Sequence, residues 1–124
     1  MKQVLATEQA PAAIGPYSQG IAAGETVYVS GQLPLDPATG AFPEGIAAQT
    51  AQSLKNIQAI LAQQGMTLAN VVKTTVFLAD INDFAEMNKV YGEFITQPYP
   101  ARSAVQVAKL PKDAPLEIEC IAVK

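Results

Sequence analysis

The stretch Pro100-Ala101-Arg102-Ser103-Ala104-Val105-Gln106-Val107 puts one charged residue at the start of an alternating segment. From Arg102 onward, even-numbered residues fall on one face and odd-numbered residues on the other. Alternation after a proline, with valines on one face, predicts a β-strand. Such a strand would hold the guanidinium rigidly, and its fork of donors matches a carboxylate or a phosphate. A second interpretation stays open, in which Arg102 is an exposed arginine in an ordinary ion pair.

Length and composition indicate one folded domain over residues 1–124, since 49% of the residues are hydrophobic and 15% are charged. The net charge of −3 and the lack of a basic cluster make nucleic acid an unexpected partner. No apolar run is long enough for a membrane span, and the first residues do not resemble a signal peptide. The single cysteine, Cys120, excludes an internal disulfide and fits a cytoplasmic protein.

The chain contains no histidine, which excludes Ser-His and Cys-His catalysis and histidine metal sites. One cysteine cannot build a thiolate site either, so we expect no metal. An enzyme made from this chain has to use carboxylates, arginine, tyrosine, hydroxyl groups, backbone groups and water.

Hydrophobic periodicity predicts six strands and two helices. Strands are expected at 2–6, 18–23, 26–32, 71–79, from 102, and at 116–123; helices are expected at 46–64 and from 80–84 to before Pro98. This order predicts an α+β fold with one sheet and two helices packed on one of its faces. The apolar segment 71–79 predicts a central strand covered on both faces, so the uncovered face of the sheet favours an oligomer.

The helix ends carry their own signals. Gly65 is expected to supply a left-handed cap after the first helix. At the second helix, Asp83 and Glu86 resemble a capping box, and Asn82 is a competing cap.

Five residues outside the Arg102 strand are candidates for chemistry, each with a structural alternative. Tyr17 ends a proline-rich loop, and its alternative role is to cap the core with its hydroxyl in water. Gly31 ends a strand, where another group approaches the backbone closely, or a turn or bulge forms. Asn88 lies beside an apolar helix stripe and is otherwise a solvated amide. Glu117 and Glu119 share one face of the last strand, which is otherwise solvated at that end.

Five stretches together resemble the reactive intermediate deaminases, the Rid or YjgF family, and among them the RidA subgroup. They are Ala12-Ala13-Ile14-Gly15-Pro16-Tyr17-Ser18-Gln19-Gly20, Val29-Ser30-Gly31-Gln32-Leu33-Pro34, Val72-Lys73-Thr74-Thr75-Val76-Phe77-Leu78, Pro100-Ala101-Arg102-Ser103, and Leu110-Pro111-Lys112-Asp113 with Glu117-Ile118-Glu119. The motifs cover essentially the whole chain in the family's order. The resemblance implies a chorismate-mutase-like fold with a six-stranded mixed sheet, and a homotrimer with sites between subunits.

The resemblance also implies an activity, the hydrolysis of 2-imino acids and their 2-enamino tautomers to 2-keto acids and ammonia. Such imines are released by pyridoxal-phosphate-dependent dehydratases that act on serine or threonine. The family's site residues carry over onto Tyr17, Ser30, Gly31, Asn88, Arg102 and Glu117. Relatives often have a cysteine two residues after the arginine, where this chain has Ala104, so a thiol has no role at this position.

The expected chemistry follows from these residues. Arg102 would clamp the substrate carboxylate, and a water held by Glu117 would attack C2. The Gly31 backbone and the Tyr17 hydroxyl would bond the imine nitrogen or the water. No cofactor is needed, because an imine is already a strong electrophile.

Two rival functions remain from the sequence: a non-catalytic module that senses small 2-keto acids through Arg102, and an endoribonuclease. One geometric question also remains. If the last two strands formed a simple hairpin, Glu117 would lie opposite about Val107, roughly 15 Å along the strand from Arg102. Either those strands are not hairpin neighbours, or the site takes a residue from another chain.

Overall fold

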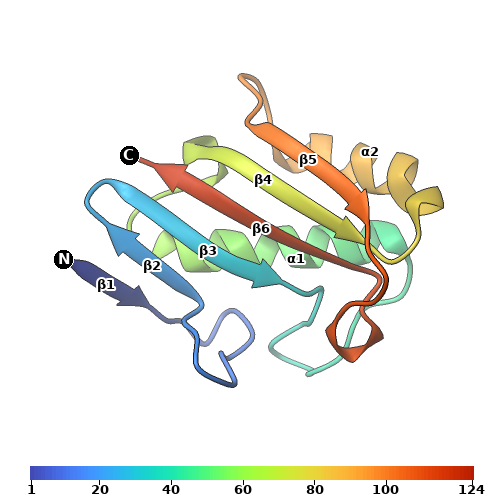
Figure 1. Ribbon diagram of the computed structural model, residues 1–124, viewed down its shortest axis with the longest axis horizontal. Helices are drawn as coiled ribbons and strands as arrows, with labels where there is room; N and C mark the ends of the chain where they lie inside the picture. Colours follow the sequence, from blue (N-terminus) through green and yellow to red (C-terminus); the bar gives the residue numbers. More distant parts are fainter.

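The two helices lie on one face of a six-stranded sheet, and the other face is open (Figure 1). The structure is a computed structural model that describes residues 1–124. The strands are β1 (Lys2–Leu5), β2 (Gly20–Ala23), β3 (Thr26–Gln32), β4 (Val71–Leu78), β5 (Ala101–Gln106) and β6 (Leu116–Val123). The predicted α+β class and all six strands are confirmed, with ends that differ by one or two residues.

The helices are α1 (Ile46–Ala62) and α2 (Phe84–Phe94), with short 3-10 turns η1 (Leu68–Asn70), η2 (Ile81–Asp83) and η3 (Pro111–Asp113). Gly65 has a φ of 66°, which confirms the left-handed turn after α1. Asp83 is the N-cap residue of α2, as expected, but the capping box with Glu86 and the alternative cap by Asn82 are wrong. Asp80 instead accepts a hydrogen bond from the backbone N–H of Asn82 and starts η2, and the Asp83 side chain caps nothing. The side-chain cap moves forward because a 3-10 turn precedes α2.

The strand order is β1-β2-β3-β6-β4-β5, and only β4 and β5 run parallel. The last two strands are therefore not hairpin neighbours, because β4 lies between them. Phe77 of β4 pairs with Glu117 on one side and with Val105 on the other. Glu117 thus lies in line with Val105, two strands away, and not opposite Val107.

The core fills the space between the helices and one face of the sheet. Its fully buried side chains include Leu54, Ile57, Ile60, Leu61, Val76, Leu78, Met87, Leu116 and Ile118. This chain covers only one face of β4, so burial of both faces, as predicted for a central strand, would need a further chain. On the open face Lys73, Thr75 and Phe77 are only half-buried, because no element of this chain lies over them. No helix is both long and apolar enough to cross a membrane.

Candidate active site

The carboxylate of Glu117 lies directly against the backbone of Gly31. A Cβ atom built on Gly31 would come within 2.6 Å of Glu117 Cδ and would overlap Oε2. The pairing of β3 with β6 shifts register between Val29 and Gln32, so Gly31 also lies in a bulge. Both predicted roles of this glycine are therefore present, since the bulge lets backbone and carboxylate approach closely.

A cavity of about 640 Å³ opens at this contact. Four of the six predicted site residues line it, namely Tyr17, Ser30, Gly31 and Glu117. They come from the loop before β2, the end of β3 and the start of β6. The pocket also contains apolar groups such as Ile14 and Leu33. It therefore combines one carboxylate, hydroxyl groups and an apolar wall in a space large enough for a small organic acid.

Ser30 is held by two hydrogen bonds to the loop that precedes β2. Its hydroxyl donates to the Ser18 carbonyl at 2.6 Å, and its backbone N–H donates to the Gln19 carbonyl at 2.9 Å. Because the hydroxyl hydrogen is already used, Ser30 offers the pocket only its oxygen lone pairs. Its contribution is that of an acceptor for a donor such as water or a protonated imine.

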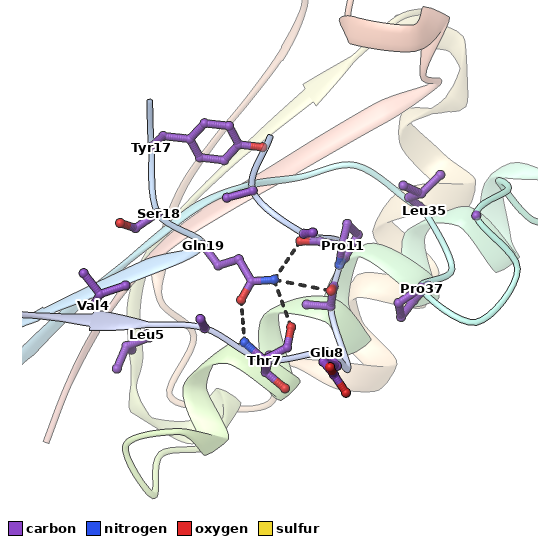
Figure 2. A pocket seen from close by; sticks show the side chains of 15 residues that line it. Val4, Leu5, Thr7, Glu8, Pro11, Tyr17, Ser18, Gln19, Leu35 and Pro37 are labelled. Carbon is purple, nitrogen blue, oxygen red and sulfur yellow. Dashed lines mark hydrogen bonds between the residues drawn. The ribbon is translucent and has the colours of Figure 1, made fainter. Parts of the chain in front are cut away.

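The loop that leads to Tyr17 is held by the buried side chain of Gln19 (Figure 2). Its Oε1 accepts from the Thr7 backbone N–H at 2.7 Å. Its Nε2 donates to the carbonyls of Thr7, Ala10 and Pro11 at 3.0, 3.3 and 2.7 Å. A second cavity of about 650 Å³ lies on this side of the loop. It contains neither Glu117 nor Gly31, so the first cavity is the better candidate site.

The other side of the site pocket is held by Asn56 on α1. This fully buried amide donates to the carbonyls of Leu33 and Leu35 at 3.2 and 3.0 Å and accepts from Gln52 at 2.9 Å. Sequence analysis assigned no role to Asn56 or to the Gln19 side chain. The sequence feature that could have indicated Asn56 is its place in α1, beside Ile57 and one turn before Ile60, next to the apolar stripe of the helix.

Arg102 and Asn88 form a separate cluster between β5 and α2. Arg102 Nη1 donates to Asn88 Oδ1 at 2.7 Å. The guanidinium lies over the Tyr91 ring, 4.7 Å from its centroid, and 5.5 Å from that of Phe84. The Tyr91 hydroxyl is in turn hydrogen-bonded to Thr74 at 2.7 Å. The guanidinium is thus fixed by stacking and by one amide, and Asn88 is not merely a solvated amide.

The two clusters do not meet within one chain. Thr74 pairs with Arg102 and with Cys120, so these three residues share the face covered by the helices. Glu117, three residues from Cys120, lies on the open face. The offset amounts to about 10 Å along the strands and about 10 Å across them, in addition to the change of face.

Burial of the Glu117 side chain raises the pKa of its carboxyl, and the neighbouring Glu119 raises it further. Arg102 lies on the other face of the sheet, so within one chain it does not lower the pKa of this carboxyl. The pKa of Tyr91 is raised by burial, against the lowering effects of its bond to Thr74 and of Arg102. Burial raises the pKa of Cys120 to about 12, so this thiol stays protonated and unreactive.

The fold and the pocket define a class of protein, a small α+β protein with a carboxylate-bearing cleft at the end of its central strands. A family model described as "Endoribonuclease L-PSP" matches residues 7–124. The chain belongs to this family, the Rid/YjgF family, as the sequence motifs predicted.

Several relatives match along almost their whole length. The chain is 53% identical to the 2-iminobutanoate/2-iminopropanoate deaminase of Salmonella typhimurium, covering 100% of this chain and 99% of the relative. The crystal structure of RidA from an Antarctic Psychrobacter species matches with a TM-score of 0.95 at 49% identity, over 98% and 99% of the two chains. Escherichia coli TdcF with bound serine matches with a TM-score of 0.94 at 47% identity, over 98% of both chains. The predicted YjgF-type fold is confirmed.

Proposed function

We propose that this protein is a 2-iminobutanoate/2-iminopropanoate deaminase, a hydrolase of C=N bonds that converts reactive imines and enamines to 2-keto acids and ammonia. The full-length similarity to relatives with that name supports the reaction. The observation that carries the proposal is the Glu117 carboxylate held against Gly31 in a pocket of suitable size. We propose no cofactor, because the substrate is itself electrophilic.

The substrate site lies between subunits of a homotrimer in this proposal. Arg102 and Glu117 cannot reach one ligand within one chain, since they lie on opposite faces of the sheet. The open face also exposes large apolar side chains, among them Tyr28 at 50% and Val105 at 44%. Such a face is suited to contact with further copies of the chain. A second chain then brings its Arg102 and Asn88 to the pocket of the first.

The mechanism uses positioning and proton transfer through Glu117. Arg102 binds the substrate carboxylate through donors that Asn88 leaves free, which orients C2. Water attacks C2 of the protonated imine, and Glu117 accepts the proton that the water loses. Glu117 returns that proton to the nitrogen of the carbinolamine. As the C–N bond breaks, Glu117 takes the hydroxyl proton, which leaves the 2-keto acid, and the proton then passes to the departing ammonia to give ammonium. The Ser30 oxygen and the Tyr17 hydroxyl line the pocket where the nitrogen and the water have to lie.

Coupling the purified protein to a threonine dehydratase tests this function directly. The dehydratase releases the imine in place, and the appearance of 2-keto acid is followed with and without the protein. We expect acceleration by the wild type and none by Arg102→Ala. If a 2-keto acid binds but its formation is not accelerated, the protein is a binding module.

An endoribonuclease is the second candidate, favoured only by the description of the family model. The net charge of −3 and the single cation among the residues that line the pocket count against RNA binding. RNA cleavage that co-elutes with the protein and survives Arg102→Ala would establish it.

The proposed trimer has its own test. A sedimentation mass equal to one chain at micromolar concentration would refute the assembly.

A further inference from the structure

Lys112 is the only cation among the residues that line the Glu117 pocket. Of the 13 lining residues, only Lys112 and Glu117 carry a charge. Lys112 is exposed, so it lies at the rim of the pocket. The one ion pair of the chain joins Lys109 to Asp113, which leaves the Lys112 ammonium without a carboxylate partner. An isolated ammonium beside a pocket for organic acids is available to bind an anion.

The backbone of Lys112 is in a conformation that a lysine adopts only at a cost. Its φ is 58° and its ψ is 23°, and Asp113 follows with a φ of 54°. Two successive residues with side chains in the left-handed region are both strained. Glycine or asparagine would occupy Lys112's conformation with less strain. Strain of this kind gathers at functional sites, which sets Lys112 apart from an ordinary solvated lysine.

The strained turn is fixed at both ends by buried residues. Leu110 is 7% exposed and Ala114 is 1% exposed. Inside the turn, the Asp113 N–H donates to the Leu110 carbonyl and the Ala114 N–H donates to the Pro111 carbonyl, both at 3.1 Å. An exposed ion pair between Lys109 and Asp113, at 2.9 Å, also spans the turn. The chain therefore holds Lys112 at the pocket rim instead of leaving it on a free loop.

We propose that Lys112 is a second recognition residue for the substrate carboxylate, supplied by the same chain as Glu117. The inference rests on the proposed function and deepens it, because Arg102 comes from another chain. A carboxylate has about four lone-pair sites, so it accepts both the arginine fork and one ammonium. Lys112 thus binds the acid from the chain that supplies Glu117, and Arg102 of the second chain fixes the orientation of the acid.

Because the substrate carboxylate keeps its charge while water adds to C2, the contact of Lys112 with it is the same before and during the reaction. Equal stabilisation of the substrate and of the transition state lowers KM and leaves kcat unchanged. This separates Lys112 from Arg102 and Glu117, whose loss lowers kcat. Lys112 is a substrate-binding residue and not the base.

The test compares Lys112→Gln and Lys112→Arg with Lys55→Gln, which removes the same charge from the exposed face of α1. The probe is 2-oxobutanoate, with its methyl ester as an uncharged analogue, and affinity is measured by calorimetry. We expect Lys112→Gln to weaken acid binding and raise KM by about threefold or more, with kcat within about twofold. Lys112→Arg should stay near the wild type, and ester binding should not change.

Lys112→Gly controls for a folding defect. It removes the charge, and glycine adopts the positive φ without strain, so a loss of affinity in this variant cannot come from a destabilised turn. We expect it to lose the same affinity for the acid at an equal or higher melting temperature. The proposal is overturned if Lys112→Gln binds the acid as Lys55→Gln does, if the ester loses affinity equally, or if the wild type binds no keto acid. Failure of the proposed function is a separate result, namely acid binding without turnover by the wild type.

Discussion

Arg102 and Glu117 lie on opposite faces of the sheet, with β4 between their strands. Each is held in its own way, Arg102 by Tyr91 and Asn88, Glu117 by the bulge at Gly31. Rotation of side chains cannot bring the two groups to one small ligand. If both residues act on one substrate, two chains have to supply them.

Mixing two inactive variants tests this arrangement. Arg102→Ala and Glu117→Gln each lack half of every site, so each homotrimer should be inactive. In a mixed trimer one of the three interfaces joins an intact Arg102 to an intact Glu117. Random mixing makes about three quarters of the trimers mixed, which should restore about a quarter of the wild-type activity.

The measurement is turnover after the two proteins are unfolded and refolded together, with each protein refolded alone as the control. A site contained in one chain predicts no recovery, because every chain lacks one residue. Sedimentation of the refolded mixture checks that trimers have formed.

Arg102→Lys should lose most of the activity, at least about tenfold, since lysine keeps the charge but not the fork. The melting temperature should move little, because the stacking of Arg102 on Tyr91 and its bond to Asn88 are made by a partly exposed side chain. Thermal unfolding and coupled turnover are measured on the same preparation. Full activity, or a large loss of stability, would make Arg102 a structural arginine.

Gly31→Ala should displace the Glu117 carboxylate, because the new Cβ would overlap Oε2 and lie 2.6 Å from Cδ. The carboxylate ends a flexible side chain, so it can move aside and the fold should survive. We expect turnover to fall at least about tenfold with a small change in melting temperature. Gly24→Ala is a second glycine control for folding, since its Cβ would meet nothing within 4 Å, although its φ of 61° adds some strain. Unchanged turnover in Gly31→Ala would mean that the position of Glu117 does not matter.

The sequence predicted the layers of the fold better than it predicted how the candidate site residues come together. Alternation located β5 and β6 and correctly put Glu117 with Glu119 on one face. Local periodicity carries no information on which strands pair, so the insertion of β4 between β5 and β6 could not be seen. Whether Arg102 and Glu117 share a face depends on that pairing.

The sequence also did not indicate the residues that hold the loops around the site, and the reason is physical. Asn56 and Gln19 act by hydrogen-bonding backbone carbonyls of loops far away in sequence, 21 residues away in the bond from Asn56 to Leu35. Nothing in the local pattern indicates such a partner. Lys112 was part of a recognised motif, but its positive φ depends on the turn between two buried anchors.

The pKa of the Glu117 carboxyl reports on the assembly. Within one chain burial and Glu119 raise it. Arg102 from a second chain would favour the charged form and lower it again. A base has to be ionised, so activity falls as the pH falls through this pKa. Arg102→Gln should therefore move the Glu117 titration to higher pH, followed by carbon NMR of the glutamate carboxyls. If Glu117 titrates identically in the trimeric wild type and in the trimeric variant, Arg102 of a second chain does not lie beside Glu117.

The final prediction is that Glu117, not Glu119, is the base. The two carboxylates share a strand face about 6.6 Å apart. Only Glu117 lines the pocket with Tyr17 and Gly31, whereas Glu119 lines a smaller cavity of about 230 Å³ with Tyr28. Glu117→Gln keeps shape and hydrogen bonding but cannot accept the proton. It should bind 2-oxobutanoate yet turn over imine at least tenfold more slowly, a barrier increase of about 1.4 kcal/mol.

Glu119→Gln is the matched control, since it removes the same charge from the same face and should leave turnover nearly intact. Both variants are compared by coupled turnover and by affinity for 2-oxobutanoate, because loss of turnover with retained affinity separates proton transfer from binding. The reverse pattern, a slow Glu119→Gln and a normal Glu117→Gln, would make the assignment wrong. If neither variant is slow, water attacks the imine without a protein base, and the acceleration comes from the hold on the substrate carboxylate alone.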